Sequence, residues 1–91
     1  MFGLVCLKSR DVYKEGSYVN FCIEKNKSMK FSGRIYNITE KGVVCFDRIM
    51  VKRNNGEYVS IDSKMFFGVY EINCCIRGGN VYDRVAVQRY K

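Results

Sequence analysis

The sequence predicts an all-β protein, a small and strongly bent antiparallel barrel of five to seven strands with at most one short helix. Three observations predict this class. Segments with alternating apolar and polar residues recur about every ten residues, turn-forming residues separate them, and no long window shows a helical repeat of apolar residues. Because an alternation of this kind is typical of strands with one buried face, each segment is expected to form a strand.

The pattern is most regular over residues 30–50, which predict two strands joined by a turn at Gly42. Gly33 lies inside the first strand, where a glycine often marks a sharp bend or a close backbone approach. Such a bend lets one long strand serve both sides of a small barrel. Asp47 and Arg48 interrupt the apolar run of the second strand, which predicts a bulge or a surface corner.

Further strands are expected within residues 2–7, 18–24, 58–62, 65–76 and 81–90. Polar turns are expected at residues 25–29, 52–57 and 78–80. In the second of these turns, Asn55 followed by Gly56 predicts a primed β-turn. Residues 9–16 are expected to form either a loop or one helical turn capped by Ser9.

A single domain over residues 1–91 is expected, because no repeat, low-complexity run or linker divides the chain. The apolar runs are only a few residues long, whereas a helix that spans a membrane needs about 20 apolar residues. No membrane partner is therefore expected. The first residues lack the basic leader and cleavage site of a signal peptide, which predicts a cytoplasmic location.

The chain has five cysteines and no histidine. The cysteine spacing fits no zinc site, so neither a metal nor another cofactor is expected. Cys6, Cys22 and Cys45 lie in apolar runs and are interpreted as small buried residues, reduced in a cytosol. Cys74 and Cys75 are adjacent, so one is expected to face inward and the other outward, with a redox-active pair as the alternative.

Catalysis is not expected, and no residue is assigned a catalytic role. Histidine, the commonest general base, is absent, and the carboxylates are scattered without a paired spacing. No motif of a nucleophile elbow, a phosphate-binding loop or a dinucleotide fold occurs. Ser63 and Lys64 are neighbours, but adjacent residues on a strand point to opposite faces, which is poor geometry for a Ser–Lys nucleophile.

The excess of positive charge favours a binding function. The chain has 16 Lys and Arg residues against nine Asp and Glu residues, a formal net charge of +7. A charge of this size on a small domain is typical of a protein that binds nucleic acid or an acidic partner. A basic surface that only keeps the protein in solution is the simpler alternative.

The aromatic residues, seven Tyr and six Phe, favour nucleic acid, because several lie beside cations. Arg34 and Tyr36 are two residues apart, so on a strand they share a face and would contact the same RNA or single-stranded DNA. The phosphate contacts are expected from two basic loops, through Lys25, Lys27, Lys30, Lys52 and Arg53. The alternatives are that the tyrosines border the core, as Tyr18 and Tyr58 are expected to do, and that the charged loops are simply solvated.

A second class of function is a small protein-binding or inhibitory module, of the kind that a phage or another mobile element encodes. It would dock on an acidic surface of a partner protein. The aromatic-rich stretch Met65–Tyr70 and an exposed strand edge would serve such docking by strand addition.

The central sequences FSGRI (31–35), VVCFD (43–47) and FFGVYEI (66–72) resemble the Sm-like family of RNA-binding small barrels, and SH3-like barrels share this pattern. The resemblance covers residues 18–72 and implies a small barrel, RNA binding and a homo-oligomeric ring. The asparagine of the family's nucleotide-binding loop has no clear counterpart here, and its bacterial histidine signature is absent. Residues 74–91 are additional to the family pattern.

Overall fold

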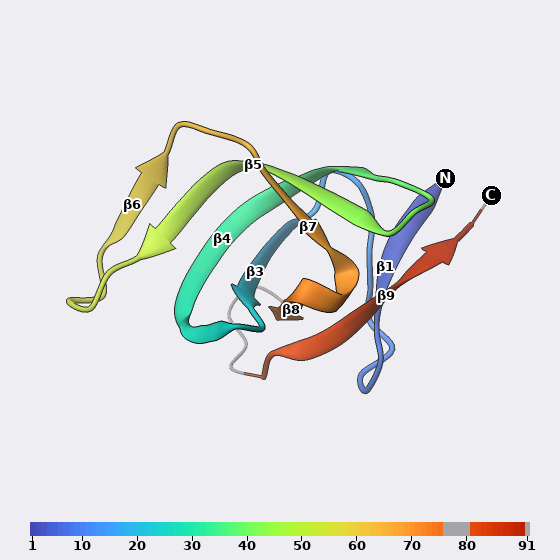
Figure 1. Cartoon of the computed structure of the whole chain (residues 1–91), viewed down its shortest axis with the longest axis horizontal. Helices are drawn as coiled ribbons and strands as arrows, with labels where there is room; N and C mark the ends of the chain where they lie inside the picture. Colours follow the sequence, from blue (N-terminus) through green and yellow to red (C-terminus); the bar gives the residue numbers. More distant parts are fainter. Residues whose placement is uncertain (76–80, 91) are drawn as a thin grey trace.

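The computed structural model describes residues 1–75 and 81–90 and confirms the all-β class (Figure 1). Within these residues, nine strands form one antiparallel sheet, and one 3-10 turn, η1, covers Val69–Glu71. The strands are β1 (Phe2–Cys6), β2 (Val12–Tyr13), β3 (Tyr18–Ile23), β4 (Asn26–Ile38), β5 (Val43–Lys52), β6 (Tyr58–Ile61), β7 (Met65–Gly68), β8 (Ile72–Cys75) and β9 (Asp83–Arg89).

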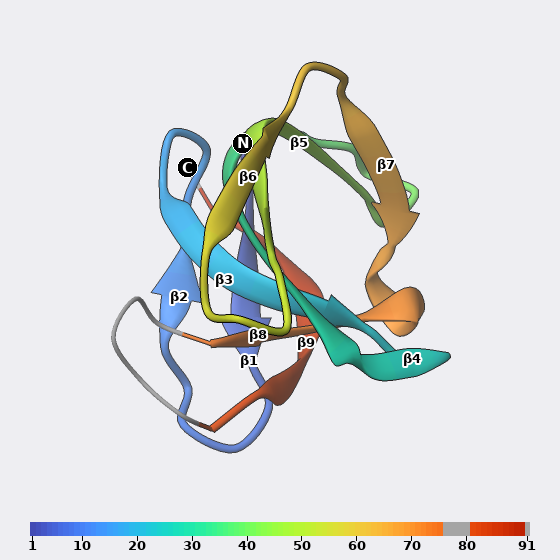
Figure 2. The same ribbon diagram turned by 90° about the vertical axis from the view of Figure 1, so that its left-hand side faces the viewer.

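The strands pair in the order β2-β1-β9-β8-β3-β4-β5-β6, and β7 pairs with the first half of β5. The two ends of the chain lie side by side (Figure 1), and the amide of Tyr90 donates to the carbonyl of Met1 at 2.9 Å. Over the described ranges, β2 and β6 remain the two ends of the order. The expected closure into a barrel is therefore not observed, and the fold is an open sheet that curves around its core (Figure 2).

The sheet has more strands than the five to seven expected, for two local reasons. The stretch 65–76 was expected to hold one strand, but η1 divides it into β7 and β8. Glu71 Oε1 accepts a hydrogen bond from the amide of Gly68 at 2.8 Å and thereby fixes this change of direction. Residues 9–16 form no helical turn, and they contain the two-residue strand β2. The turn expected at 78–80 lies outside the described residues.

The core is centred on a stack of phenylalanine rings on the concave side of the sheet. Phe21 stacks on Phe46 with ring centroids 4.0 Å apart and on Phe31 at 5.2 Å, and Phe67 tilts against the first pair. The fully buried side chains around this stack are Leu4, Val19, Ile35, Val44, Ile49, Ile72 and Cys74. Strands from both ends of the chain contribute to this set, so its apolar burial stabilises the whole sheet.

The expected close approach at Gly33 is confirmed. A Cβ at this position would lie 3.3 Å from a side-chain carbon of Ile49 and 3.4 Å from both the Asp47 carbonyl oxygen and the Phe21 ring. The register of β4 against β5 shifts at the same place, and Arg48 has a φ of 50°. The bulge expected at Asp47 and Arg48 is therefore present, and the backbones of β4 and β5 meet where the sheet bends.

The hairpins on either side of β5 end in turns of the same type. In each turn, an amide donates to the carbonyl three residues before it, from Gly42 to Thr39 and from Gly56 to Arg53. Both glycines have a φ of +87°, whereas Asn55 does not have a positive φ. The prediction of a primed turn at Asn55 and Gly56 is therefore wrong. Each loop has one residue more than a primed turn would have, and its glycine forms a bulge beside the next strand.

All five cysteines are buried, which confirms the expected burial of Cys6, Cys22 and Cys45. The expectation that one of Cys74 and Cys75 faces outward is wrong, since both are buried. Their strand, β8, lies in the middle of the sheet between β3 and β9. A residue on either face of a central strand is covered more easily than one at an edge.

Candidate nucleic-acid interface

The residues expected to bind nucleic acid lie in three places. They are on the outer face of β4 (Arg34, Tyr36), at the β3–β4 turn and the start of β4 (Lys25, Lys27, Lys30), and at the β5–β6 turn (Lys52, Arg53). Residues 25–29 were expected to form a turn, but β4 begins at Asn26, which pairs with Ile23. The turn is thus only two residues long, and it does not form a basic loop.

Arg34 is held by an acid of the neighbouring strand. Its Nε and Nη2 donate to Oδ1 and Oδ2 of Asp47 at 2.8 and 2.6 Å. Both side chains are partly buried, and the hydrogen bonds from Arg34 lower the pKa of the Asp47 carboxyl. Such a two-pronged pair is strong and well oriented. The pair uses the Nε and Nη2 donors of Arg34, so a phosphate would have to bind the remaining N–H groups or displace Asp47.

Tyr36 is also engaged within the chain. The Lys64 ammonium lies 4.9 Å from the centre of its ring, so one face of the ring is already covered by a cation. Burial raises the pKa of the Tyr36 hydroxyl, and the nearby Cys45 thiol adds to this. Arg34 and Tyr36 do share a face of β4, as expected, and each already has a partner within the chain.

Two of the three lysines near the β3–β4 turn have partners. Lys27 pairs with Glu24 at 3.3 Å, and the Lys30 ammonium donates to the Lys27 carbonyl while lying 4.3 Å from the centre of the Tyr82 ring. Glu24 also accepts hydrogen bonds from Asn73 and Arg84. These bonds, above all the one from Asn73, lower the pKa of the Glu24 carboxyl. Lys25 is exposed at the turn itself.

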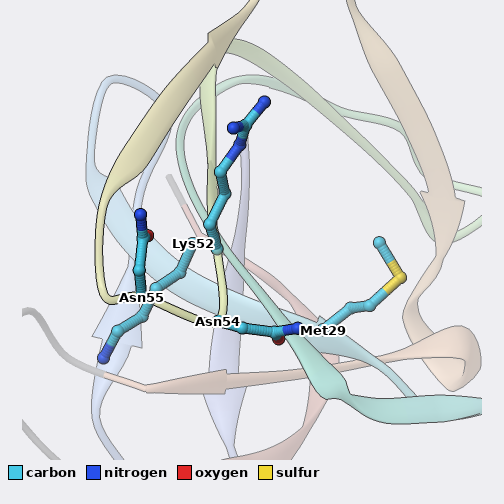
Figure 3. A pocket seen from close by; sticks show the side chains of 5 residues that line it. Met29, Lys52, Asn54 and Asn55 are labelled. Atoms are coloured by element: carbon cyan, nitrogen blue, oxygen red, sulfur yellow. The ribbon is translucent and has the colours of Figure 1, made fainter.

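Lys52 and Arg53 are exposed neighbours, and neither forms an ion pair within the part of the chain that the structure describes. Together with Met29, Asn54 and Asn55 they line an open hollow of about 540 Å³ between the start of β4 and the β5–β6 turn (Figure 3). Figure 3 shows Lys52 and Asn55 on one side of the turn and Asn54 and Met29 on the other. The hollow therefore has cationic, amide and thioether groups around it.

Sequence reasoning missed Met29 and the two asparagines, although the strand register could have indicated them. Phe31 pairs with Val51, so continuing the antiparallel register brings the residues before Phe31 beside those after Val51. Tyr58 was also missed. It was expected to border the core, but it is 46% exposed and lies directly across from Lys52 on β6.

The chain matches no family model, no curated protein and no solved structure. The part of the chain that the structure describes contains no helix long and apolar enough to cross a membrane. The geometry of the β5–β6 turn provides charge and hydrogen-bonding groups on an open surface, which is an arrangement suited to binding a large anion.

Proposed function

We propose that this protein is a non-catalytic module that binds nucleic acid, either RNA or single-stranded DNA. One observation carries the proposal. Lys52 and Arg53 stand together at a hairpin turn, without an acidic partner among the described residues, in a chain of net charge +7. Unpaired cations attract phosphates and release counterions when they bind, so this site would supply affinity that does not depend on sequence.

The groups around the hollow support the same reading. Asn54 and Asn55 carry amides that can donate to phosphate or sugar oxygens, and Met29 offers an apolar surface to a sugar or a base. Lys25 is exposed at the neighbouring turn and would extend the positive field. In this proposal Arg34 joins β4 to β5 through Asp47, and Tyr36 packs against Lys64. Neither residue contacts the ligand.

The test is a fluorescence-anisotropy titration of a mixed pool of single-stranded RNA and DNA at about 50 and about 200 mM salt. We expect binding that weakens steeply with salt. Reversing two charges with Lys52→Glu and Arg53→Glu is expected to weaken binding by more than tenfold and to flatten its salt dependence, because two phosphate contacts are lost. An unchanged affinity in this variant would show that the turn is not part of the site.

The matched control reverses two other exposed lysines, with Lys8→Glu and Lys41→Glu. Lys41 lies in the β4–β5 turn, at the opposite end of β5 from Lys52 (Figure 1). Both double variants change the net charge equally, so only a local site makes them differ. Equal losses in the two variants would indicate that total charge, not this turn, determines binding.

A second candidate function is the docking of an acidic partner protein, and one observation favours it. In the described part of the sheet β7 pairs only with β5, so its other edge is available for an added strand. Phe66 on β7 and Tyr70 on η1 are 59% and 72% exposed beside this edge. Large exposed aromatic residues are enriched at protein interfaces.

This candidate is tested by affinity capture with the wild-type protein and with a Phe66→Ser, Tyr70→Ser variant. We expect a partner retained by the wild type to be lost from the variant, because the anchoring rings are absent. Capture of the same proteins by both would exclude this edge as the docking site. The predicted cytoplasmic location and homo-oligomeric state are compatible with both functions. Cell fractionation tests the location, and light scattering tests the oligomeric state.

A further inference from the structure

The outer face of the β5–β6 hairpin presents an exposed aromatic ring next to the proposed phosphate site. Val59 and Ile61 of β6 are half-buried, whereas Tyr58 and Ser60, which alternate with them, are exposed on the opposite face. Tyr58 pairs across the strands with Lys52, and Ser60 pairs with Met50, which is 37% exposed. Cross-strand partners lie on the same face of a sheet, so the Tyr58 ring stands beside the Lys52 side chain.

A cation–aromatic pair includes a lysine of β4, the strand on the other side of β5 from Tyr58. Lys30 stands over the ring of Tyr82, with its ammonium 4.3 Å from the ring centre. Phe31 pairs with Val51 and Tyr58 pairs with Lys52, so continuing this register places Lys30 across from Lys52, on the side of β5 away from Tyr58. Lys52 on β5 thus lies between Tyr58 on β6 and Lys30 on β4.

This arrangement matches the repeating chemistry of an unpaired nucleic-acid strand. Each nucleotide carries one phosphate and one flat base, and a base can stack on an exposed aromatic ring while neighbouring cations contact the phosphates. The bases of a duplex are already paired and stacked, so their faces are closed to a side chain that lies on a protein surface. An exposed tyrosine next to unpaired cations therefore distinguishes single strands from duplexes.

We propose that Tyr58 stacks on an unpaired base and makes the β5–β6 hairpin selective for single-stranded nucleic acid over duplex. The inference rests on the proposed function and assigns its base-contacting residue. Tyr58 fits this role better than Tyr36, whose ring already carries the Lys64 ammonium on one face. The Tyr58 side chain is 46% exposed, and it forms no hydrogen bond or ring contact among the described residues.

The first experiment compares Tyr58→Ala and Tyr58→Phe in binding to oligothymidine, to an abasic oligonucleotide of the same length and to a duplex. We expect Tyr58→Ala to weaken oligothymidine binding about tenfold, the usual effect of losing one stacked base. Tyr58→Phe is expected to bind like the wild type, because the ring remains. Binding of the abasic strand and of the duplex is expected to be equal in all three proteins.

A second experiment observes the stacking directly. The chain contains no tryptophan, so Tyr58→Trp introduces a single fluorophore at the site. Oligothymidine is expected to quench its emission, whereas the abasic strand is expected to leave the emission unchanged. The control is Tyr70→Trp, at an exposed position on η1, whose emission should not respond to either ligand.

The outcomes separate this inference from the proposed function. Salt-sensitive binding of oligothymidine that Tyr58→Ala leaves unchanged would overturn the stacking role of Tyr58, while the charge-driven function would stand. Equal loss of affinity for the abasic strand in Tyr58→Ala would also overturn it. If the wild-type protein binds none of the three ligands at about 50 mM salt, the proposed function fails and the stacking role fails with it.

Discussion

At the scale of the single residue, Gly33 has little free space on the side where a Cβ would stand. The three atoms nearest to a Cβ placed there belong to Ile49, Asp47 and Phe21, and two of these residues lie in the core. The Asp47 contact is a backbone oxygen, which cannot rotate away as a side chain could. A methyl group at residue 33 would therefore require its neighbours on β3 and β5 to shift by a few tenths of an ångström.

We expect Gly33→Ala to lower the free energy of unfolding by about 1–3 kcal/mol, the usual cost of overpacking a tight site. Urea unfolding followed by circular dichroism measures this loss. Ser32→Ala is the control, because its side chain lies on the outer face of the same strand and should change stability little. A Gly33→Ala variant as stable as the wild type would mean that the two strands can separate there without cost.

Sequence reasoning succeeded at Gly33 because a glycine weakens a strand, so one that lies within a regular alternation usually marks a bend or a close approach. It assigned Arg34 and Tyr36 to a ligand because a shared face is visible in the alternation, whereas cross-strand partners are not. Asp47 faces Arg34 only because the bulge at Arg48 shifts the register of β5. The presence of a bulge could be predicted, but its effect on the pairing could not.

At the scale of the element, β4 and β5 are joined by the Arg34–Asp47 pair as well as by their backbone hydrogen bonds. The pKa of Asp47 lies below its ordinary value of 3.8 in the folded protein. An acid whose pKa is lowered by folding stabilises the fold above its ordinary pKa. This contribution is lost as the pH falls through the folded-state pKa.

The wild-type protein is therefore expected to lose stability on acidification from about pH 5 to below about pH 3. Asp47→Asn should be less stable than the wild type at neutral pH, because Arg34 loses its ionic partner. On acidification the variant should lose less stability than the wild type does. Urea midpoints across this pH range test both expectations. Asp62→Asn, at an exposed carboxyl without an ion pair among the described residues, should follow the wild-type curve, and an identical curve for Asp47→Asn would contradict the assignment.

The positions of the hairpins could be predicted, since Gly42 and Gly56 mark both turns next to alternating strands. Their type could not, because the count of residues in a loop depends on where the last strand pair forms. The same limit applies to the hollow at Lys52 and Arg53. The basic residues of the hollow could be identified from the sequence. Met29 lies beside them only because β4 pairs with β5, and the sequence does not reveal that pairing.

At the scale of the whole molecule, the sheet depends on strands from both ends of the chain. β1 lies beside β9, and β8 lies beside β3, so the outer strands continue the sheet past the segment 18–72. Leu4 and Val85 from these strands belong to the core. The described residues after position 73 thus contribute the end of β8 and the whole of β9 to the sheet, a role that the family resemblance did not imply.

We expect a chain shortened to residues 18–72 to lose cooperative folding, because the exposed edge of β3 and the missing core residues leave too little apolar burial. Thermal unfolding followed by circular dichroism would show a broad, weak transition instead of a sigmoidal one. Residues 2–90 should unfold like the full chain. A sharp transition in the short chain would show that the outer strands are dispensable.

The all-β class followed from local alternation, and therefore the sequence sufficed to predict it. The order of the strands did not follow, because β1–β9 and β3–β8 join segments far apart in the chain, and an alternating pattern carries no information about its distant partner. For the same reason, the sequence did not reveal that the sheet stays open. Whether β6 meets β2 depends on the curvature of the complete sheet.

The pairing of the first strand with the last also determines how the molecule responds to tension. Phe2 pairs with Arg89 and Cys6 with Val85, so both termini leave the sheet at the same end of one antiparallel pair. A force applied to the two termini opens these hydrogen bonds one after another, like a zipper, rather than loading all of them at once. In an optical trap the protein should therefore yield at low force, with β1 and β9 peeling off before the phenylalanine core separates.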